Sequence, residues 1–306
     1  MEKITLGKSN LETPRIAVGC MRIYGMDKKS AESFINGAME LGANFFDHAD
    51  IYGRGACESV FADAVSMTPS VREKMILQSK CGIVPGKMFD FSKRHILESV
   101  DGILSRLKTD YLDVLLLHRP DALCEPEEVA AAFDELYRSG KVRNFGVSNH
   151  NPMQMELLQR YLTRPILANQ LQLSIAHAPM ITNGINVNMM SDAAAGRDGS
   201  VLDYCRLKDI TIQAWSPFQY GTFAGVFLGS KDFPALNAKL DELAAKYSVS
   251  NTTIAAAWIL RHPARMQVVT GTTKLERLKD CVKAAEISLT REEWYEIYLA
   301  AGYILP

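Results

Sequence analysis

Three features that mark other classes of protein are missing from this sequence of 306 residues. Its six cysteines, at positions 20, 57, 81, 124, 205 and 281, form no CxxC pair, so neither a zinc ribbon nor a disulfide framework is indicated. No apolar run approaches the roughly 18 residues that a membrane span needs. The first residues, MEKITLGKSN, lack the apolar segment of a secretory signal. These absences predict a protein of the reducing cytoplasm.

An excess of charge of either sign is also missing. Lysine and arginine number 34 and aspartate and glutamate 35, which gives a formal net charge of -1. This balance predicts no nucleic-acid partner and no anionic membrane surface. No linker, internal repeat or low-complexity tract interrupts the chain, so we expect one domain over residues 1–306. Oligomeric state is left open, and no cluster of ligands suggests a metal.

The sequence does contain eight apolar, strand-like runs separated by segments of helical period. Several runs, such as DVLLLH, are continuously apolar, as is typical of parallel strands that are buried on both faces. In the helical segment FSKRHILESVDGILSRLK, Ser92 is the predicted cap. The eight runs are residues 15–20, 45–50, 75–82, 111–118, 142–149, 166–174, 210–218 and 266–273.

Eight strands that alternate with helices predict a (β/α)8 barrel. The competing architecture, a doubly wound sheet, usually carries a GxGxxG turn after its first strand, and GCMRIYG does not match that pattern. Two regions depart from the repeat. The first 14 residues predict a short hairpin, and residues 178–200, which have no clear period, predict a long loop after the sixth strand.

Polar side chains gather at the ends of the predicted strands, where an α/β barrel builds its active site. Asp47 and Tyr52 follow the second strand, Lys80 ends the third, and His118 ends the fourth. A lysine inside the apolar run ILQSKCG needs a partner, because lysine is rarely buried unless it is paired. Asp47, on the neighbouring strand, is the predicted partner.

These four residues together suit the reduction of a carbonyl group. The ammonium of Lys80 favours the phenolate of Tyr52 and is expected to lower the pKa of that phenol toward the working range. His118 can direct an N–H at the carbonyl oxygen. Taken alone, each residue has an ordinary structural explanation as a turn residue, a half-buried aromatic or an ion pair. Asp50 is expected to be structural.

The same stretches resemble the aldo-keto reductases. FDHADIYG is similar to that family's D-x-A-x-x-Y-G signature, LQSKCG to its lysine motif and LDVLLLHRPD to its histidine motif. SGKVRNFGVSN, ANQLQLS, QAWSPF and VVTGTTKLERLKD resemble the later strands. The resemblance covers essentially the whole chain in order and spacing, and the motifs are most similar to those of bacterial YdhF-like oxidoreductases.

The resemblance implies NADPH bound without a Rossmann fold, with Tyr52 as general acid and base. It implies that Ser148, Asn149 and Gln170 bind the nicotinamide carboxamide and that Trp215 stacks on its ring. The adenosine 2′-phosphate would lie near the start of the last predicted helix, whose amides favour an anion. The implied cofactor set is Gly19, Met21, Ser148, Asn149, Gln170, Trp215, Ser216, Pro217, Phe218, Gly271, Thr272, Lys274, Arg277 and Asp280.

The expected substrate is a small aldehyde or ketone. Aromatic residues of the strand-end loops could wall its pocket or could pack only within those loops. They are Tyr24, Tyr220, Phe223 and Phe227. Two other functions stay open: a non-catalytic NADPH-binding sensor subunit, and a barrel aldolase that uses Lys80 as a Schiff-base nucleophile. The sequence sets neither the substrate, nor the direction of reaction, nor the strictness of the preference for NADPH over NADH.

Overall fold

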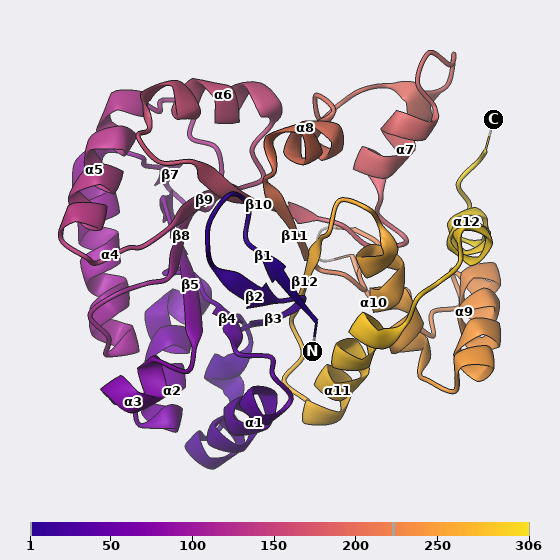
Figure 1. Cartoon of the computed structure of the whole chain (residues 1–306), viewed down its shortest axis with the longest axis horizontal. Helices are drawn as coiled ribbons and strands as arrows, with labels where there is room; N and C mark the ends of the chain where they lie inside the picture. The colour runs from indigo at the N-terminus through magenta and orange to yellow at the C-terminus, as the bar shows by residue number, and fades with distance from the viewer. Residues whose placement is uncertain (1, 222–223, 306) are drawn as a thin grey trace.

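Eight parallel strands close into a barrel in this computed structural model, which describes residues 2–221 and 224–305 (Figure 1). Neighbours around the barrel follow chain order, and the last strand pairs with the first. The (β/α)8 prediction is confirmed, and each strand lies inside its predicted run. The strands are β3 (Ile16–Gly19), β4 (Phe45–Asp47), β5 (Ile76–Cys81), β8 (Val114–Leu117), β9 (Phe145–Ser148), β10 (Ile166–Gln172), β11 (Thr211–Trp215) and β12 (Gln267–Thr270).

Helices surround the barrel and follow its strands in turn. The α-helices are α1 (Lys28–Glu40), α2 (Ala56–Val65), α3 (Pro69–Arg72), α4 (Lys93–Leu107), α5 (Pro126–Arg138), α6 (Pro152–Tyr161), α7 (Pro179–Ile185), α8 (Val201–Lys208), α9 (Pro234–Tyr247), α10 (Asn251–Arg261), α11 (Leu275–Lys283) and α12 (Arg291–Ala300). Short 3-10 helices are η1 (Ile23–Gly25), η2 (Tyr52–Gly55), η3 (Asp192–Ala194) and η4 (Ala284–Glu286). Figure 1 shows α9 and α12 beyond the ring, beside α10.

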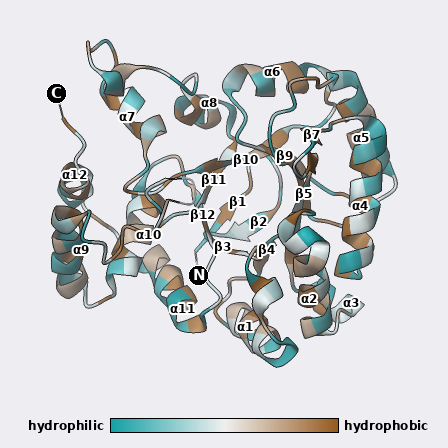
Figure 2. Ribbon diagram, turned by 180° about the vertical axis from the view of Figure 1, so that it is seen from behind, coloured by the Kyte–Doolittle hydropathy of each residue, from teal (hydrophilic) through white to brown (hydrophobic). Residues whose placement is uncertain are grey.

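The main hydrophobic core lies between the strands and the helices (Figure 2). Every residue of β8 is buried, as its continuous apolar sequence predicts. The barrel interior holds smaller apolar clusters, one of which includes Leu6, Val114 and Leu116. Apolar contacts on both faces of the strands therefore hold in place the strand ends that carry the polar residues.

Local sequence signals set several helix boundaries. The hydroxyl of Ser92 accepts a hydrogen bond from the backbone N–H of His95 at 3.3 Å, so the predicted cap of α4 is present. Helix α6 begins with a capping box between Asn151 and Gln154. Among the described residues, no helix is both long and apolar enough to cross a membrane.

The predicted hairpin near the start of the chain is formed by β1 (Lys3–Thr5) and β2 (Glu12–Pro14). Leu6 of its turn is fully buried inside the barrel. Gly7 has a positive φ of 53°, and a Cβ there would meet the Leu167 carbonyl oxygen at 2.5 Å, so this close approach requires glycine. The hairpin thus closes the amino end of the barrel and leaves the opposite end for a site.

The prediction for residues 178–200 was incomplete. This segment is not a plain loop, because it contains α7 and η3. Pro179 stands at the first position of α7, where proline is favoured. The helix has only seven residues, which is too short to produce a readable period. A second hairpin, β6 (Ile83–Val84) with β7 (Met88–Phe89), was also not predicted.

Candidate active site

Three neighbouring barrel strands bring four predicted residues together at the carboxyl end. Asp47 is the last residue of β4, and Tyr52 opens η2 just beyond it. Lys80 lies in β5, and His118 directly follows β8. Strand β4 pairs with β5, and β5 pairs with β8.

Lys80 is the centre of this group and is completely buried. Its Nζ lies 2.8 Å from the carboxylate of Asp47, 2.7 Å from the carbonyl oxygen of His48 and 3.2 Å from the hydroxyl of Tyr52. The three ammonium protons therefore have three acceptors. The ion pair between Lys80 and Asp47 that the sequence predicts is present.

The net pKa of Tyr52 differs from the expectation. Burial raises the pKa of the phenol and outweighs the lowering by Lys80, and Asp47 raises it further. The sequence shows the ammonium near Tyr52 but not the desolvation of the phenolate. The phenol is therefore protonated at neutral pH, and Lys80 reduces the cost of its ionisation without reversing the direction.

The pKa of Lys80 is also raised. Burial alone would lower it, but the charges of Asp47 and Tyr52 together with their hydrogen bonds outweigh desolvation. The lysine is consequently a permanent cation at neutral pH. A cationic amine cannot act as a nucleophile, so its surroundings disfavour a Schiff-base role.

His118 faces Tyr52 edge-on, with 5.9 Å between the ring centroids. Burial, together with the positive charges of Lys80 and Arg119, lowers the pKa of His118 well below its ordinary value. The imidazole is therefore neutral at neutral pH, so it can donate one N–H without carrying charge.

A chain of glutamines inside the barrel holds the other side of Asp47. Gln78 Nε2 donates to Asp47 Oδ1 at 2.6 Å, and Gln170 Nε2 reaches the same oxygen at 3.2 Å. Gln78 and Gln213 exchange hydrogen bonds, and Gln213 continues the chain to Gln267. Of these four glutamines, only Gln170 was predicted from the sequence to be a polar residue in an apolar strand. The same signal, applied to LQSK, IQAW and MQVV, would have found the other three.

The amide nitrogen of Gln170 points at Asp47 and Gln213, and its role toward a nicotinamide stays a prediction. Ser148 Oγ donates to the carbonyl oxygen of Gln170 at 2.9 Å, and Asn149 Nδ2 donates to Ser148 Oγ at 2.8 Å. Trp215 Nε1 donates to Asn149 Oδ1 at 3.3 Å. This bond fixes the half-buried indole at the mouth of the barrel, which is the opening at the carboxyl ends of its strands. Ser148 and Asn149 do not cap α6, which Asn151 caps.

Two residues that directly follow barrel strands have strained backbone. Asn149 after β9 has φ 58°, and Ser216 after β11 has φ 51°. Residues other than glycine adopt this left-handed region at a cost, and such positions cluster at functional sites. Pro217 is buried and Phe218 half-buried in the same segment.

The remaining implied cofactor residues lie at the ends of β3 and β12. Gly19 ends β3, and the carbonyl oxygen of Met21 is 3.3 Å from Cys57 Sγ. Thr272 Oγ1 accepts from the N–H of Lys274 at the start of α11. In the described part of the chain, the exposed side chains of Lys274 and Arg277 have no ion-pair partner. Gly271 is exposed and Asp280 half-buried.

The four aromatic residues expected around a substrate have different surroundings in the structure. Phe227 is fully buried in the main core, so the pocket-wall interpretation is wrong for it. Tyr220 packs on Phe233, with 5.1 Å between the ring centroids. Tyr24 is 60% exposed and therefore open to solvent beside Gly53. Phe223 lies outside the described residues.

Arg119 is a residue of this mouth that the sequence argument missed. Its guanidinium carbon lies 5.8 Å from the centroid of the Trp215 ring, and the ionised form of Tyr52 would raise its pKa. Burial outweighs that effect and lowers the pKa of Arg119. No ion pair or hydrogen bond of this side chain occurs within residues 2–221 and 224–305. The motif LLLHRPD contained the signal, because an arginine directly follows the strand-end histidine.

Comparisons with known proteins identify the family of the chain. Residues 15–300 match the model of the Aldo/keto reductase family. The chain belongs to the aldo/keto reductase family. It is 33% identical to the oxidoreductase YdhF of Escherichia coli and 35% identical to the oxidoreductase YcsN of Bacillus subtilis, each over 100% of both chains. A thermostable aldo-keto reductase solved with the inhibitor epalrestat is also similar, with a TM-score of 0.76 and 26% identity over 98% of this chain and 100% of the other. Membership of this family makes the protein an oxidoreductase of the carbonyl-reducing type.

Proposed function

We propose that the protein is an NADPH-dependent reductase that converts the carbonyl group of an aldehyde or ketone into an alcohol. Tyr52 is the proton donor, Lys80 and Asp47 provide its electrostatic surroundings, and His118 orients the carbonyl oxygen. The observation that carries the proposal is the buried ammonium of Lys80, whose Nζ lies 3.2 Å from the Tyr52 hydroxyl.

The hydrogen-bond directions suit proton donation by Tyr52. Its oxygen accepts from Lys80, which leaves its own proton available for donation. The raised pKa keeps the phenol in the donor form at neutral pH. Proton transfer to the much more basic alkoxide is favourable, and the adjacent ammonium stabilises the phenolate that remains.

NADPH would supply the hydride when bound, and the residues of the mouth fit it. The half-exposed indole of Trp215, held by Asn149, offers a flat apolar surface to a nicotinamide ring. Lys274 and Arg277 stand unpaired, within the described residues, at the start of α11, where cations and helix amides suit a phosphate.

The position of Arg119 favours a substrate that carries an oxygen-rich or anionic group beside its carbonyl. An arginine whose guanidinium carbon lies 5.8 Å from the centroid of the Trp215 ring can donate several hydrogen bonds to such a group. One relative, 33% identical over 98% of both chains, is a 6-dehydroglucose reductase of Agrobacterium fabrum. A sugar aldehyde therefore belongs in the substrate panel.

The test is the loss of NADPH absorbance with a panel of aromatic, aliphatic and sugar aldehydes, with NADH assayed in parallel. Tyr52→Phe should reduce kcat at least about a hundredfold, because general acid catalysis contributes that much or more. NADPH binding, measured by fluorescence, should be retained. Tyr161→Phe, a change of the same kind at a 38% exposed site, should behave as wild type.

The other two functions give different results in this experiment. A sensor subunit would bind NADPH but would reduce no member of the panel, with or without Tyr52. A Schiff-base aldolase would become covalently labelled at Lys80 when substrate and borohydride are added together. Full turnover in Tyr52→Phe would refute proton donation by the phenol.

A further inference from the structure

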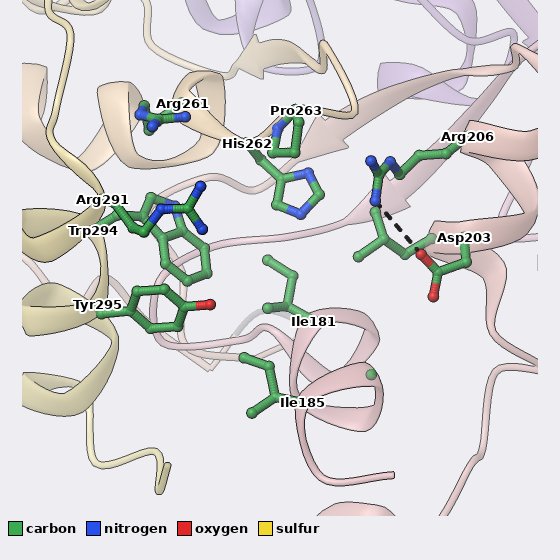
Figure 3. A pocket seen from close by; sticks show the side chains of 12 residues that line it. Ile181, Ile185, Asp203, Arg206, Arg261, His262, Pro263, Arg291, Trp294 and Tyr295 are labelled. Atoms are coloured by element: carbon green, nitrogen blue, oxygen red, sulfur yellow. Dashed lines mark ion pairs between the residues drawn. The ribbon is translucent and has the colours of Figure 1, made fainter.

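A cavity, called the flank cavity below, lies on the outer flank of the barrel, between α7, α8, the end of α10 and the start of α12 (Figure 3). Its volume is about 370 Å³, within the range of small-molecule sites. None of the residues that line it belongs to the strand-end group described above. The cavity therefore needs an explanation separate from carbonyl reduction.

The lining of this flank cavity is strongly cationic. It contains three arginines, Arg206, Arg261 and Arg291, against one carboxylate, Asp203, so three positive charges minus one negative charge leave two positive. Arg206 and Asp203 are only loosely paired, at 3.7 Å. Arg261 Nε donates to the Leu289 carbonyl oxygen at 2.6 Å. This charge excess favours an anion.

Arg291 is the least explained of the three arginines. It has no ion pair or hydrogen bond within the described ranges 2–221 and 224–305. It also occupies the first turn of α12, where the helix dipole disfavours a cation. In Figure 3, Arg291 and Arg206 extend toward the cavity from opposite sides. An anion between them would account for both positions.

The remaining walls are apolar and rigid. Trp294 is 8% exposed and stacks on Trp258, with 4.8 Å between the ring centroids. Tyr298 also stacks on the indole of Trp294, with 5.8 Å between the ring centroids. Ile181 and Ile185 of α7 lie opposite the rings of Trp294 and Tyr295 (Figure 3). A flat apolar body can be buried here without reorganising the walls.

His262 adds a neutral hydrogen-bond donor to the lining. Its Nδ1 accepts from the backbone N–H of Ala264 at 3.1 Å, so the proton of the neutral ring lies on Nε2. Burial, together with the charge of Arg206, lowers the pKa of His262 to about 4, so the ring is uncharged at neutral pH. It can therefore donate to an oxygen without adding to the positive charge.

We propose that the flank cavity binds a small aromatic carboxylate. The carboxylate lies between the guanidinium groups of Arg206 and Arg291, and the ring packs between Trp294 and the isoleucines of α7. A bidentate guanidinium matches a planar carboxylate, and a one- or two-ring body suits the volume. The inference concerns binding alone and does not depend on the reductase proposal.

The test is isothermal titration of the full chain with 2-naphthoate and with its neutral analogue 2-naphthamide. The acid should bind at least about tenfold more tightly than the amide, since a charge-assisted pair is stronger than a neutral hydrogen bond. Arg291→Met and Arg206→Met should each remove that preference. Arg138→Met, at a side chain that is 81% exposed on α5, should keep it.

Neither substitution endangers the fold. Arg291→Met removes a cation from a helix N-terminus, and Arg206 is an exposed residue of α8, so the melting temperatures should stay near that of wild type. Equal binding of acid and amide would overturn the proposal. So would wild-type binding of 2-naphthoate by both arginine variants, or failure of the wild-type protein to bind it.

Discussion

Two buried ion pairs stand at opposite ends of the same barrel. At the carboxyl end, Lys80 pairs with Asp47 at 2.8 Å, and their side chains are 0% and 3% exposed. At the amino end, Arg72 pairs with Asp113 at 2.6 Å, and their side chains are 5% and 8% exposed. In both pairs an aspartate faces a cation in the absence of solvent.

The other partners of the two cations differ. Arg72 donates to the carbonyl oxygens of Met75 and Tyr111 and to the hydroxyl of Thr109. Asp113 also accepts from the backbone N–H of Leu77. None of these groups lies at the carboxyl end, where a substrate would accept a proton. Lys80 instead contacts a phenol, which can release one.

The comparison shows that burial and pairing alone do not indicate function. Both pairs compensate desolvation with short hydrogen bonds. Only the pair at the carboxyl end includes a group that can transfer a proton, and that is the end where barrels of this kind perform chemistry. The ion pair at the amino end therefore serves stability.

The largest expected effect comes from removing each cation in turn. Lys80→Met should lower kcat by about 10²–10⁴, because Tyr52 loses the ammonium that stabilises its phenolate. Arg72→Met should lower the free energy of unfolding by about 3 kcal/mol, at the low end for a broken buried pair, since Arg143 still contacts Asp113 at 3.5 Å. Steady-state assays and urea unfolding of both variants separate these effects. The contrast fails if folded Arg72→Met loses turnover as severely as Lys80→Met.

A smaller effect is expected at Asp50, a carboxylate of the same end without a cation partner. Its Oδ1 is buried and has no hydrogen-bond partner among the described residues. Burial, with a further contribution from Glu58, raises the pKa of Asp50 from 3.8 to about 7. The folded protein therefore binds this proton more tightly than the unfolded chain. The resulting stability is present below about pH 4 and is lost as pH rises through about 7.

Asp50→Asn removes that titration. The variant should exceed wild type in unfolding free energy by on the order of 2 kcal/mol at pH 8, after allowance for partial exposure, and by much less at pH 4.5. Chemical unfolding at the two pH values measures the difference. A gain of equal size at both would mean that Asp50 is not buried in its charged form.

The smallest expected effect concerns Arg119, a cation of the same end that has no carboxylate partner among the described residues. Arg119→Met should raise KM for 4-carboxybenzaldehyde about tenfold, which corresponds to about 1.4 kcal/mol of lost binding. KM for benzaldehyde should change by less than about twofold, since it offers no anion to the guanidinium. Equal changes for both aldehydes would assign Arg119 to the general shape of the mouth.

Much of the site was predictable because its signals are local. Asp47 and Tyr52 lie five residues apart, and Lys80 is a charged residue within a continuously apolar strand. The orientation of Gln170 was not predictable, since its partners Asp47 and Gln213 come from distant strands. Cap assignment also required the structure, because Asn149 and Asn151 are both plausible caps and only Asn151 has the needed geometry.

The sequence by itself determined the eight-stranded barrel and the strand ends that carry the polar residues, because apolar periodicity dictates which segments are buried together. Only the tertiary structure decided the net pKa of Tyr52, which depends on the balance between desolvation and the charge of Lys80. It alone also formed the flank cavity, whose walls come from segments up to about 110 residues apart: Ile181 to Tyr295. Electrostatics and cavities depend on distances through space, which the order of residues along a chain does not specify.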